Sequence, residues 1–264
     1  MKKTINFKQF SSIKIGQEAD VFMIEDFQYP HDHYLLGASN NVLIGTNPPP
    51  LMMLSKKYDY IKIEDDFLVI GAATPSGKIV SFCKKNNIAN FEFVSRLPGT
   101  LGGMLKMNAG LKEFEIFNNL VSILTCKGQV VKEDIDHGYR FTAIEDVVFE
   151  AKFKIEDGFS EEKMDLFKNM RSNQPKESSA GSCFKNPVGD YAGRLIEAVG
   201  LKGKRIGDME FSSVHANFLV NHGNGTFEDA MELILLVEQK VKAEFGIELQ
   251  REIIIVDKAY MPSV

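Results

Sequence analysis

The chain has 264 residues, of which 44% are hydrophobic and 25% are charged, a balance typical of a globular protein of about two domains or three small ones. The formal net charge of −5 argues against a nucleic-acid binder that depends on a general positive field. Its longest apolar stretches, such as 67–73 and 233–237, fall short of the roughly 20 residues of a membrane span, so we expect no membrane insertion.

The N-terminus and the cysteines predict a cytoplasmic protein. The opening MKKTINFKQF is basic, but it lacks the apolar run and the small-residue cleavage site of a signal peptide. The three cysteines, Cys83, Cys126 and Cys183, are odd in number and widely spaced. They fit free thiols in a reducing compartment better than a disulfide framework.

Strand patterns dominate the first two thirds of the chain. A hairpin is predicted over 61–70, turning at Asp65-Asp66, and another over 120–131, turning near Lys127-Gly128. Apolar and charged residues alternate over 149–155, which predicts a half-buried strand. The prolines of 47–50 and the polar stretch 171–179 predict breaks between regular elements.

Helix patterns follow. One helix is predicted to begin near Ser160, and a short one to cover 192–199 before Gly200. Thr226 and Asp229 form a capping box ahead of a longer helix that stops at Gly246. Its apolar face is predicted to contain Ala230, Ile234, Val237, Val241 and Phe245. Because hairpins and scattered helices occur without regular βαβ alternation, the predicted fold class is α+β.

Two glycine-rich segments are candidates for holding a nucleotide, since the chain has neither a GxGxxG nor a Walker A motif. The first is 37–42 and the second is 97–103, which continues into MNAG at 107–110. Glycine lets the backbone approach a ligand, and successive N–H groups can bind an anion. Glycine content alone favours ordinary turns by roughly two to one. Spacing does not decide whether Asn108 caps a backbone group or contacts a ligand.

Three other features each have a functional and an ordinary interpretation. In SAGSCFKNP at 179–187, Ser182 is a candidate nucleophile or proton donor, although a lone serine in a small-residue turn is usually structural. The loop 200–207 has three positive charges and is either solvated or a diphosphate clamp. His31 and His33 lack further ligands at a recognised spacing, so no metal site is predicted, and supporting roles are expected for His215 and His222.

Taken in order, these segments resemble the UDP-N-acetylenolpyruvoylglucosamine reductase family over nearly the whole chain. The resemblance covers the opening 11–22, the loop 36–43, PGTLGG with MNAG over 97–110, GYR at 138–140 and SAGSCFKNP. Loop 200–207, HANF at 215–218 and Glu252 complete the series. The chain departs from the family at 111–115, where a small-aromatic-glycine run is usual. It also departs at Asn173, which replaces a basic residue, and at Gln17, which replaces a glycine.

The resemblance implies bound FAD, NADPH as co-substrate and a UDP-sugar enolpyruvyl ether as substrate. It also implies a vanillyl-alcohol-oxidase-type FAD-binding fold in two subdomains, 1–50 (joined by 247–264) and 51–170, with a smaller α+β substrate-binding domain over 171–246. We expect a monomer. Two alternatives are another FAD oxidoreductase of the same fold and a catalytically silent FAD- or nucleotide-binding homologue with a regulatory role.

The site residues that the resemblance implies fall into three groups. Arg140 and Glu252 would stabilise the enolic intermediate, and Ser182 would deliver the proton. The substrate would be bound by Lys185, Asn186, Arg205 and His215. The cofactor-binding set is Leu36, Gly37, Ala38, Ser39, Asn40, Asn41, Pro98, Gly99, Thr100, Gly102, Gly103, Asn108 and Gly110.

Overall fold

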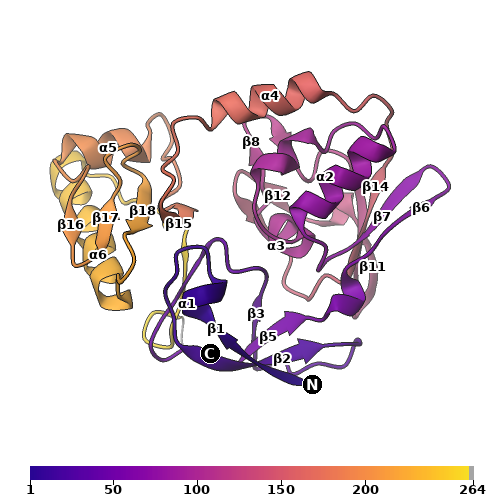
Figure 1. Cartoon of the computed structure of the whole chain (residues 1–264), viewed down its shortest axis with the longest axis horizontal. Helices are drawn as coiled ribbons and strands as arrows, with labels where there is room; N and C mark the ends of the chain where they lie inside the picture. The colour runs from indigo at the N-terminus through magenta and orange to yellow at the C-terminus, as the bar shows by residue number, and fades with distance from the viewer. Residues whose placement is uncertain (262–264) are drawn as a thin grey trace. The chain divides into compact units, whose positions relative to one another are not determined.

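The structure is a computed structural model that describes residues 1–261, and these residues form two compact units (Figure 1). The first unit comprises 1–3, 21–38 and 51–172, and the second comprises 4–20, 39–50 and the chain from 173 onward. The chain passes from one unit to the other after residues 3, 20, 38, 50 and 172. The last two of these five boundaries coincide with the breaks predicted at 47–50 and 171–179, the first three were not predicted, and the division into three domains stays a prediction.

The main sheet of the first unit has five antiparallel strands in the order β11-β10-β14-β7-β6. The strands are β6 (Ile61–Glu64), β7 (Phe67–Gly71), β10 (Leu120–Thr125), β11 (Gly128–Val131) and β14 (Glu150–Lys154). Both predicted hairpins and the predicted alternating strand are confirmed. The first hairpin can turn tightly because Asp65 adopts a left-handed backbone, with φ 52°.

Helices α2 (Ser76–Lys85), α3 (Leu101–Lys106) and α4 (Glu161–Met170) pack with this sheet (Figure 1). Their buried side chains share one core with the inward side chains of the strands, among them Leu68, Ile79, Leu105, Phe153 and Phe167. The α4 helix begins as predicted, because the Ser160 side chain accepts a hydrogen bond from Lys163 N–H. Short 3₁₀ helices cover Lys56–Tyr58, Glu92–Arg96 and Lys132–Asp134.

Shorter strands form further sheets. Strands β1 (Lys2–Asn6), β2 (Glu18–Ile24), β5 (Leu51–Leu54) and β3 (Tyr34–Leu36) follow one another in a sheet, and β5 is parallel to both β2 and β3. Two tiny hairpins pair β8 (Gly110–Leu111) with β9 (Phe114–Glu115), and β12 (His137–Gly138) with β13 (Phe141–Thr142).

The second unit has a four-stranded sheet in the order β15-β18-β17-β16, and its core includes helices α5 and α6. Strand β4 pairs in parallel with β19, which brings the C-terminal segment back to residues near position 42. The elements of this unit are α1 (Phe7–Phe10), β4 (Val42–Ile44), β15 (Ser178–Ser182), α5 (Ala192–Ala198), β16 (Arg205–Ile206), β17 (Met209–Phe211), β18 (Phe218–Asn221), α6 (Phe227–Phe245) and β19 (Ile254–Val256).

Helix α6 confirms the predicted capping box and the predicted stop. Thr226 accepts from Asp229 N–H, the Asp229 carboxylate accepts in return, and Gly246 ends the helix with φ 69°. The prediction that Phe245 belongs to the apolar face was wrong, because its side chain is 37% exposed. Arg194 covers one face of the ring at 5.5 Å instead. None of the helices in residues 1–261 combines the length and apolarity of a membrane span.

Candidate functional site

The two glycine-rich segments lie against each other in the first unit. A Cβ placed on Gly37, just after β3, would lie 3.3 Å from Thr100 Oγ1 and 3.7 Å from the Cα of Gly103. That spacing is tighter than most side-chain contacts, so the loop after β3 approaches α3 backbone to backbone. The fold therefore joins two motifs that the sequence shows only as separate turns.

The second segment is not all loop, as its glycines had suggested, because Leu101–Lys106 forms helix α3. Gly99 has φ 128°, a conformation that favours glycine, and it leads into the first turn. Gly102 donates its N–H to the Ala72 carbonyl at 2.8 Å, and a Cβ at Gly102 would lie 3.2 Å from that oxygen. Gly102 thus packs the helix against the end of β7. A Cβ at Gly103 would meet just Thr100 Oγ1, at 3.8 Å.

Ser39, in the first glycine segment, carries a buried polar atom in need of a partner. Its side chain is 3% exposed, its φ is 54°, and its Oγ has no hydrogen-bond partner within residues 1–261. The loop around it is held in the second unit, where Ser12 N–H donates to the Ser39 carbonyl and the Ser12 hydroxyl donates to Asn40. An unsatisfied buried hydroxyl costs about 1–3 kcal/mol, which a ligand oxygen such as that of a phosphate would recover.

Arg140 is bound to the MNAG segment. It lies in the turn between β12 and β13 with φ 54°, and Tyr139 is 5.3 Å from its guanidinium. Its Nη2 donates to the Gly110 carbonyl at 2.8 Å, and its Nη1 lies 3.5 Å from the Asn108 carbonyl. The predicted arginine and the predicted MNAG segment therefore meet, although about 30 residues separate them in the chain.

The Asn108 side chain contacts the start of the Arg140 turn. It is fully buried, and its Nδ2 donates to Glu115 Oε2 at 2.7 Å and to the Gly138 carbonyl at 3.1 Å. Its Oδ1 accepts from Phe117 N–H at 3.4 Å. The side chain of Asn108 thus bonds to the protein itself, while its proposed contact with a cofactor is untested.

In the second unit the structure brings Ser182 close to Glu252. Ser182 ends β15, and the carbonyl of the next residue, Cys183, accepts from Glu252 N–H at 2.8 Å and from Ile253 N–H at 3.2 Å. The Glu252 carbonyl accepts from Asn41 Nδ2 at 2.8 Å. Glu252 is therefore tied by its backbone to the residue after Ser182 and to the side chain of Asn41.

Cys183 itself belongs to the core. Its side chain is 1% exposed, and burial, the largest effect, raises the pKa of its thiol well above the usual range. The thiol is therefore out of reach of a substrate, whereas the neighbouring Ser182 is half-buried. This difference favours the serine as the reactive residue of the pair.

Asn217, which was not predicted as a site residue, holds the SAGSCFKNP segment in place. Its buried side chain accepts from Phe184 N–H at 3.0 Å and donates to the Phe184 carbonyl at 2.8 Å, and its carbonyl accepts from Cys183 N–H. The signal available was an asparagine inside the apolar stretch 216–220, because a buried amide needs partners.

Three of the four substrate-binding candidates lie near this segment. Lys185 N–H donates to the Gln250 carbonyl at 2.8 Å, and Asn186 Oδ1 accepts from Ala192 N–H at the start of α5. A Cβ at Gly193, in the same helical turn, would lie 3.5 Å from the His215 ring. Burial lowers the pKa of His215, which favours the neutral imidazole at pH 7.

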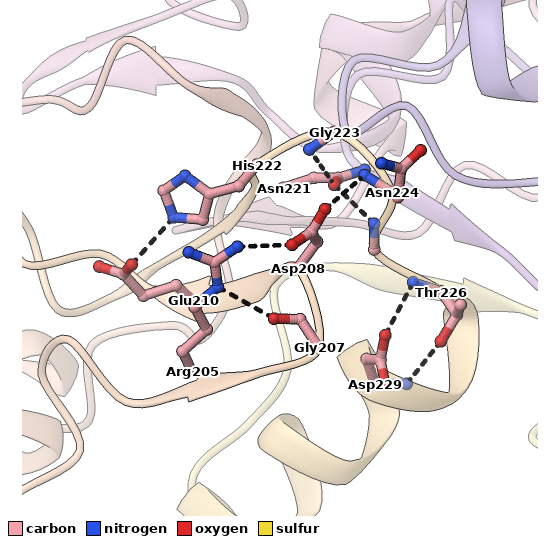
Figure 2. Close-up of polar contacts among 11 residues, drawn as sticks. Arg205, Gly207, Asp208, Glu210, Asn221, His222, Gly223, Asn224, Thr226 and Asp229 are labelled. Atoms are coloured by element: carbon pink, nitrogen blue, oxygen red, sulfur yellow. Dashed lines mark hydrogen bonds and ion pairs between the residues drawn. The ribbon is translucent and has the colours of Figure 1, made fainter.

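The fourth candidate, Arg205, is bound to its own hairpin. Figure 2 shows its guanidinium directed at Asp208 and at the Gly207 carbonyl, which it contacts at 2.5 Å and 2.9 Å. The bond from Arg205 lowers the pKa of Asp208. Lys202, in the same loop, pairs with Glu197 at 3.0 Å. Two of the three positive charges predicted for a diphosphate clamp are thus paired within the protein, and the clamp stays a prediction.

An ion pair secures the segment before Glu252. Arg251 donates two bonds to Glu238 on α6, at 2.5 Å and 2.8 Å, with both side chains about one quarter exposed. Glu238→Gln should lower the free energy of unfolding by about 1–3 kcal/mol, between the values for surface pairs and buried pairs. Urea unfolding measures this. Lys242→Gln is the control, because it breaks a well-exposed pair with Glu248, and equal losses in both variants would contradict the prediction.

No group of three or more His, Cys, Asp or Glu side chains within residues 1–261 is arranged to hold a metal ion.

Comparison with known proteins adds a consistent set of relatives. Residues 174–256 match the family described as the C-terminal domain of UDP-N-acetylenolpyruvoylglucosamine reductase. A protein of that name from Campylobacter jejuni (strain RM1221) is 48% identical over 257 residues, covering 96% of this chain and 99% of the relative. One from Helicobacter hepaticus is 44% identical over 254 residues, with 94% and 97% covered. The crystal structure of the reductase from Thermus caldophilus is similar with a TM-score of 0.85 at 26% identity, and 97% and 98% of the two chains are covered.

Proposed function

Since this chain belongs to the UDP-N-acetylenolpyruvoylglucosamine reductase family, we propose that it reduces the enolpyruvyl double bond of UDP-N-acetylglucosamine enolpyruvate to give UDP-N-acetylmuramate, a precursor of peptidoglycan. The observation that carries the proposal is 48% identity to a reductase over 96% of the chain, with no large part of either protein left over. The α+β fold and the Thermus caldophilus structure support it.

We infer that the cofactor is FAD, held in a vanillyl-alcohol-oxidase-type fold by the residues of 36–41 and 98–103. The approach of Gly37 to the Thr100 hydroxyl and to the Gly103 backbone supports this, because small residues that leave backbone N–H groups and a hydroxyl accessible suit a diphosphate. The buried Ser39 hydroxyl fits a ligand oxygen. When bound, FAD would supply the hydride for the terminal enolpyruvyl carbon, and NADPH would restore it.

The protein's own residues stabilise the negative charge that develops on the substrate and donate the proton. As hydride reaches the terminal carbon, negative charge develops on the neighbouring carbon and its carboxylate. Arg140 stabilises that charge electrostatically, and Glu252, in its protonated form, does so by donating a hydrogen bond. Ser182 donates its hydroxyl proton to the neighbouring carbon and is reprotonated from solvent. The hydrogen bond from Glu252 N–H to the Cys183 carbonyl supports these two roles, because it holds Glu252 next to the neighbour of Ser182.

We propose that 171–246 is the substrate-binding domain and that 1–50, 247–264 and 51–170 form the FAD-binding subdomains. In this assignment Lys185, Asn186 and His215 contact the UDP-sugar. Arg205 joins them if its guanidinium binds phosphate in place of Asp208. A cytoplasmic monomer is the expected form.

Two alternatives make different predictions. Another FAD oxidoreductase of this fold would be reduced by a different donor and would not be reoxidised by the enolpyruvyl substrate. A silent homologue would bind flavin without consuming NADPH. NADPH consumption that depends on UDP-N-acetylglucosamine enolpyruvate, followed by absorbance, separates all three.

The purified protein should be yellow with bound FAD, and Gly103→Ala should weaken FAD binding by at least about 10-fold, since a methyl group would stand where the ligand approaches. The apoprotein should be as stable as the parent or slightly more so, because alanine is the better helix former and Gly103 has room for a Cβ. Fluorescence titration with FAD and thermal unfolding of the apoprotein measure the two effects.

Gly77→Ala is the matched control, since Gly77 also lies in a helix and a Cβ there meets nothing within 4 Å. Its FAD affinity should stay at the parent value. A colourless protein that takes up no FAD would overturn the cofactor assignment. Unchanged FAD binding in Gly103→Ala would mean that Gly103 is an ordinary helix residue with no role in binding FAD.

A further inference from the structure

The hydrogen bonds around Asn108 link three segments of the first unit that surround the backbone of Arg140. Nδ2 of Asn108 reaches Glu115 on β9 and the Gly138 carbonyl at the start of the Arg140 turn. Gly110 and Glu115 are directly paired residues of the β8-β9 hairpin, and Arg140 donates to the Gly110 carbonyl. The contacts form a closed circuit from Arg140 through Gly110, Glu115 and Asn108 to Gly138.

This circuit supports the short turn that carries Arg140. Arg140 has a left-handed backbone, and its neighbours Tyr139 and Phe141 are 54% and 47% exposed. The β12-β13 hairpin consists of two residue pairs, His137 with Thr142 and Gly138 with Phe141. A two-pair hairpin is not stable alone, so bonds to its surroundings hold it, such as the bond from Thr142 Oγ1 to the Lys106 carbonyl at 2.9 Å. The bond from Asn108 to Gly138 and the bond from Arg140 to Gly110 add to these and help to position the guanidinium.

We propose that Asn108 and Glu115 are positioning residues for Arg140, with Asn108 acting as the donor that ties the Arg140 turn to Glu115. The inference rests on the proposed function, because it matters to catalysis only if Arg140 acts on the substrate. It also gives a role to Glu115, which lies in the segment 111–115 where the chain departs from the family's usual run.

Burial makes the hydrogen bonds of the Asn108 side chain sensitive to a change of one atom. Asn108 is fully buried, so water cannot readily replace a lost bond. Asn108→Asp has nearly the same shape but replaces the donor with an acceptor. It would face the Glu115 carboxylate and the Gly138 carbonyl, and because even a protonated aspartate has just one donor, at least one of the two hydrogen bonds is lost. Glu115→Ala removes the acceptor, whereas Glu115→Gln keeps an oxygen that accepts from Asn108.

The test measures the two half-reactions separately in the FAD-loaded enzyme by rapid mixing. Asn108→Asp and Glu115→Ala should slow reoxidation of the flavin by UDP-N-acetylglucosamine enolpyruvate by about 10²-fold, the usual cost of a small displacement of a catalytic group. Reduction of the flavin by NADPH should stay near the parent rate. Glu115→Gln should restore most of the reoxidation rate.

Matched controls come from the β8-β9 turn and the residues just after it. Asn118→Asp removes a side-chain bond to the Glu113 carbonyl, and Glu113→Gln removes an exposed charge, with Asn118 and Glu113 both exposed. Both variants leave the bonds of the Asn108 side chain unchanged and should reoxidise at the parent rate. Hydrogen exchange of the peptide 137–142 provides a readout besides activity. It should accelerate in Asn108→Asp and not in Asn118→Asp.

A double variant separates this inference from the proposed function. In an Arg140→Lys background, Asn108→Asp should slow reoxidation much less than it does in the parent, because its effect passes through Arg140. Full multiplication of the two effects, equal slowing of both half-reactions, or unchanged exchange of 137–142 would each overturn the positioning role. If instead the flavin of Arg140→Lys is reoxidised at the parent rate, the proposed role of Arg140 is wrong. Hydrogen exchange of 137–142 still tests whether Asn108 holds the Arg140 turn.

Discussion

Replacing Ser182 with alanine should slow reoxidation of the flavin by the enolpyruvyl substrate by roughly 10²–10⁴-fold, the range lost with a general acid. Reduction of the flavin by NADPH should remain nearly unchanged, because that step places no proton on carbon. Rapid-mixing absorbance at the flavin band follows each step separately. The variant should fold normally, since Ser182 is half-buried at the end of β15 and the substitution removes one hydroxyl.

Ser179→Ala is the control, because Ser179 is a half-buried serine of the same strand with a weak 3.5 Å contact to Gly181 N–H. Cys183→Ala tests the adjacent thiol, which the structure places in the core, so we expect a loss of stability with little change in either half-reaction. Equal slowing of both half-reactions in Ser182→Ala would make the serine a structural residue. A selective loss in Cys183→Ala would mean that the thiol is the donor.

Arg140→Lys should lower the turnover number by roughly 10²–10³-fold while FAD stays bound, the cost of losing one electrostatic contact to a developing anion. Lysine keeps the charge but not the planar fork, so it cannot contact the Asn108 and Gly110 carbonyls in the same way. Steady-state kinetics with a flavin absorbance spectrum of the purified variant give both quantities.

Arg194→Lys serves as the control, because Arg194 is exposed and pairs with Asp190 on the surface of the second unit. Its turnover number should match that of the parent. An unchanged turnover number in Arg140→Lys would refute the catalytic role of Arg140, and loss of FAD in that variant would place Arg140 in cofactor binding instead.

Local sequence signals predicted the regular elements well where one or two residues control the backbone. Asp65 turns one hairpin, and Thr226, Asp229 and Gly246 begin and end α6, so both elements follow from short-range chemistry. The prediction failed for Phe245, since periodicity continues to the helix end whereas the core stops a turn earlier. It missed helix α3, because a six-residue helix with two glycines looks like a loop.

The candidate site was less predictable, because it depends on contacts between distant segments. Nothing local reveals that Gly37 adjoins Gly103, or that Arg140 contacts the Asn108 carbonyl while the Asn108 side chain donates to the Gly138 carbonyl. For the charges around Arg205, the sequence indicates more than the structure supports. A run of positive residues indicates a phosphate clamp, but nearby acidic side chains can neutralise those charges, as Asp208 does for Arg205.

The central claim is that this protein passes reducing equivalents to a UDP-sugar enolpyruvyl ether, and the flavin itself reports that transfer most directly. The FAD-loaded protein is reduced with one equivalent of NADPH without oxygen and is then mixed with UDP-N-acetylglucosamine enolpyruvate. The account predicts rapid return of the oxidised flavin absorbance together with an equal amount of UDP-N-acetylmuramate. A flavin that stays reduced until oxygen is admitted would contradict it and would indicate an oxidase of the same fold.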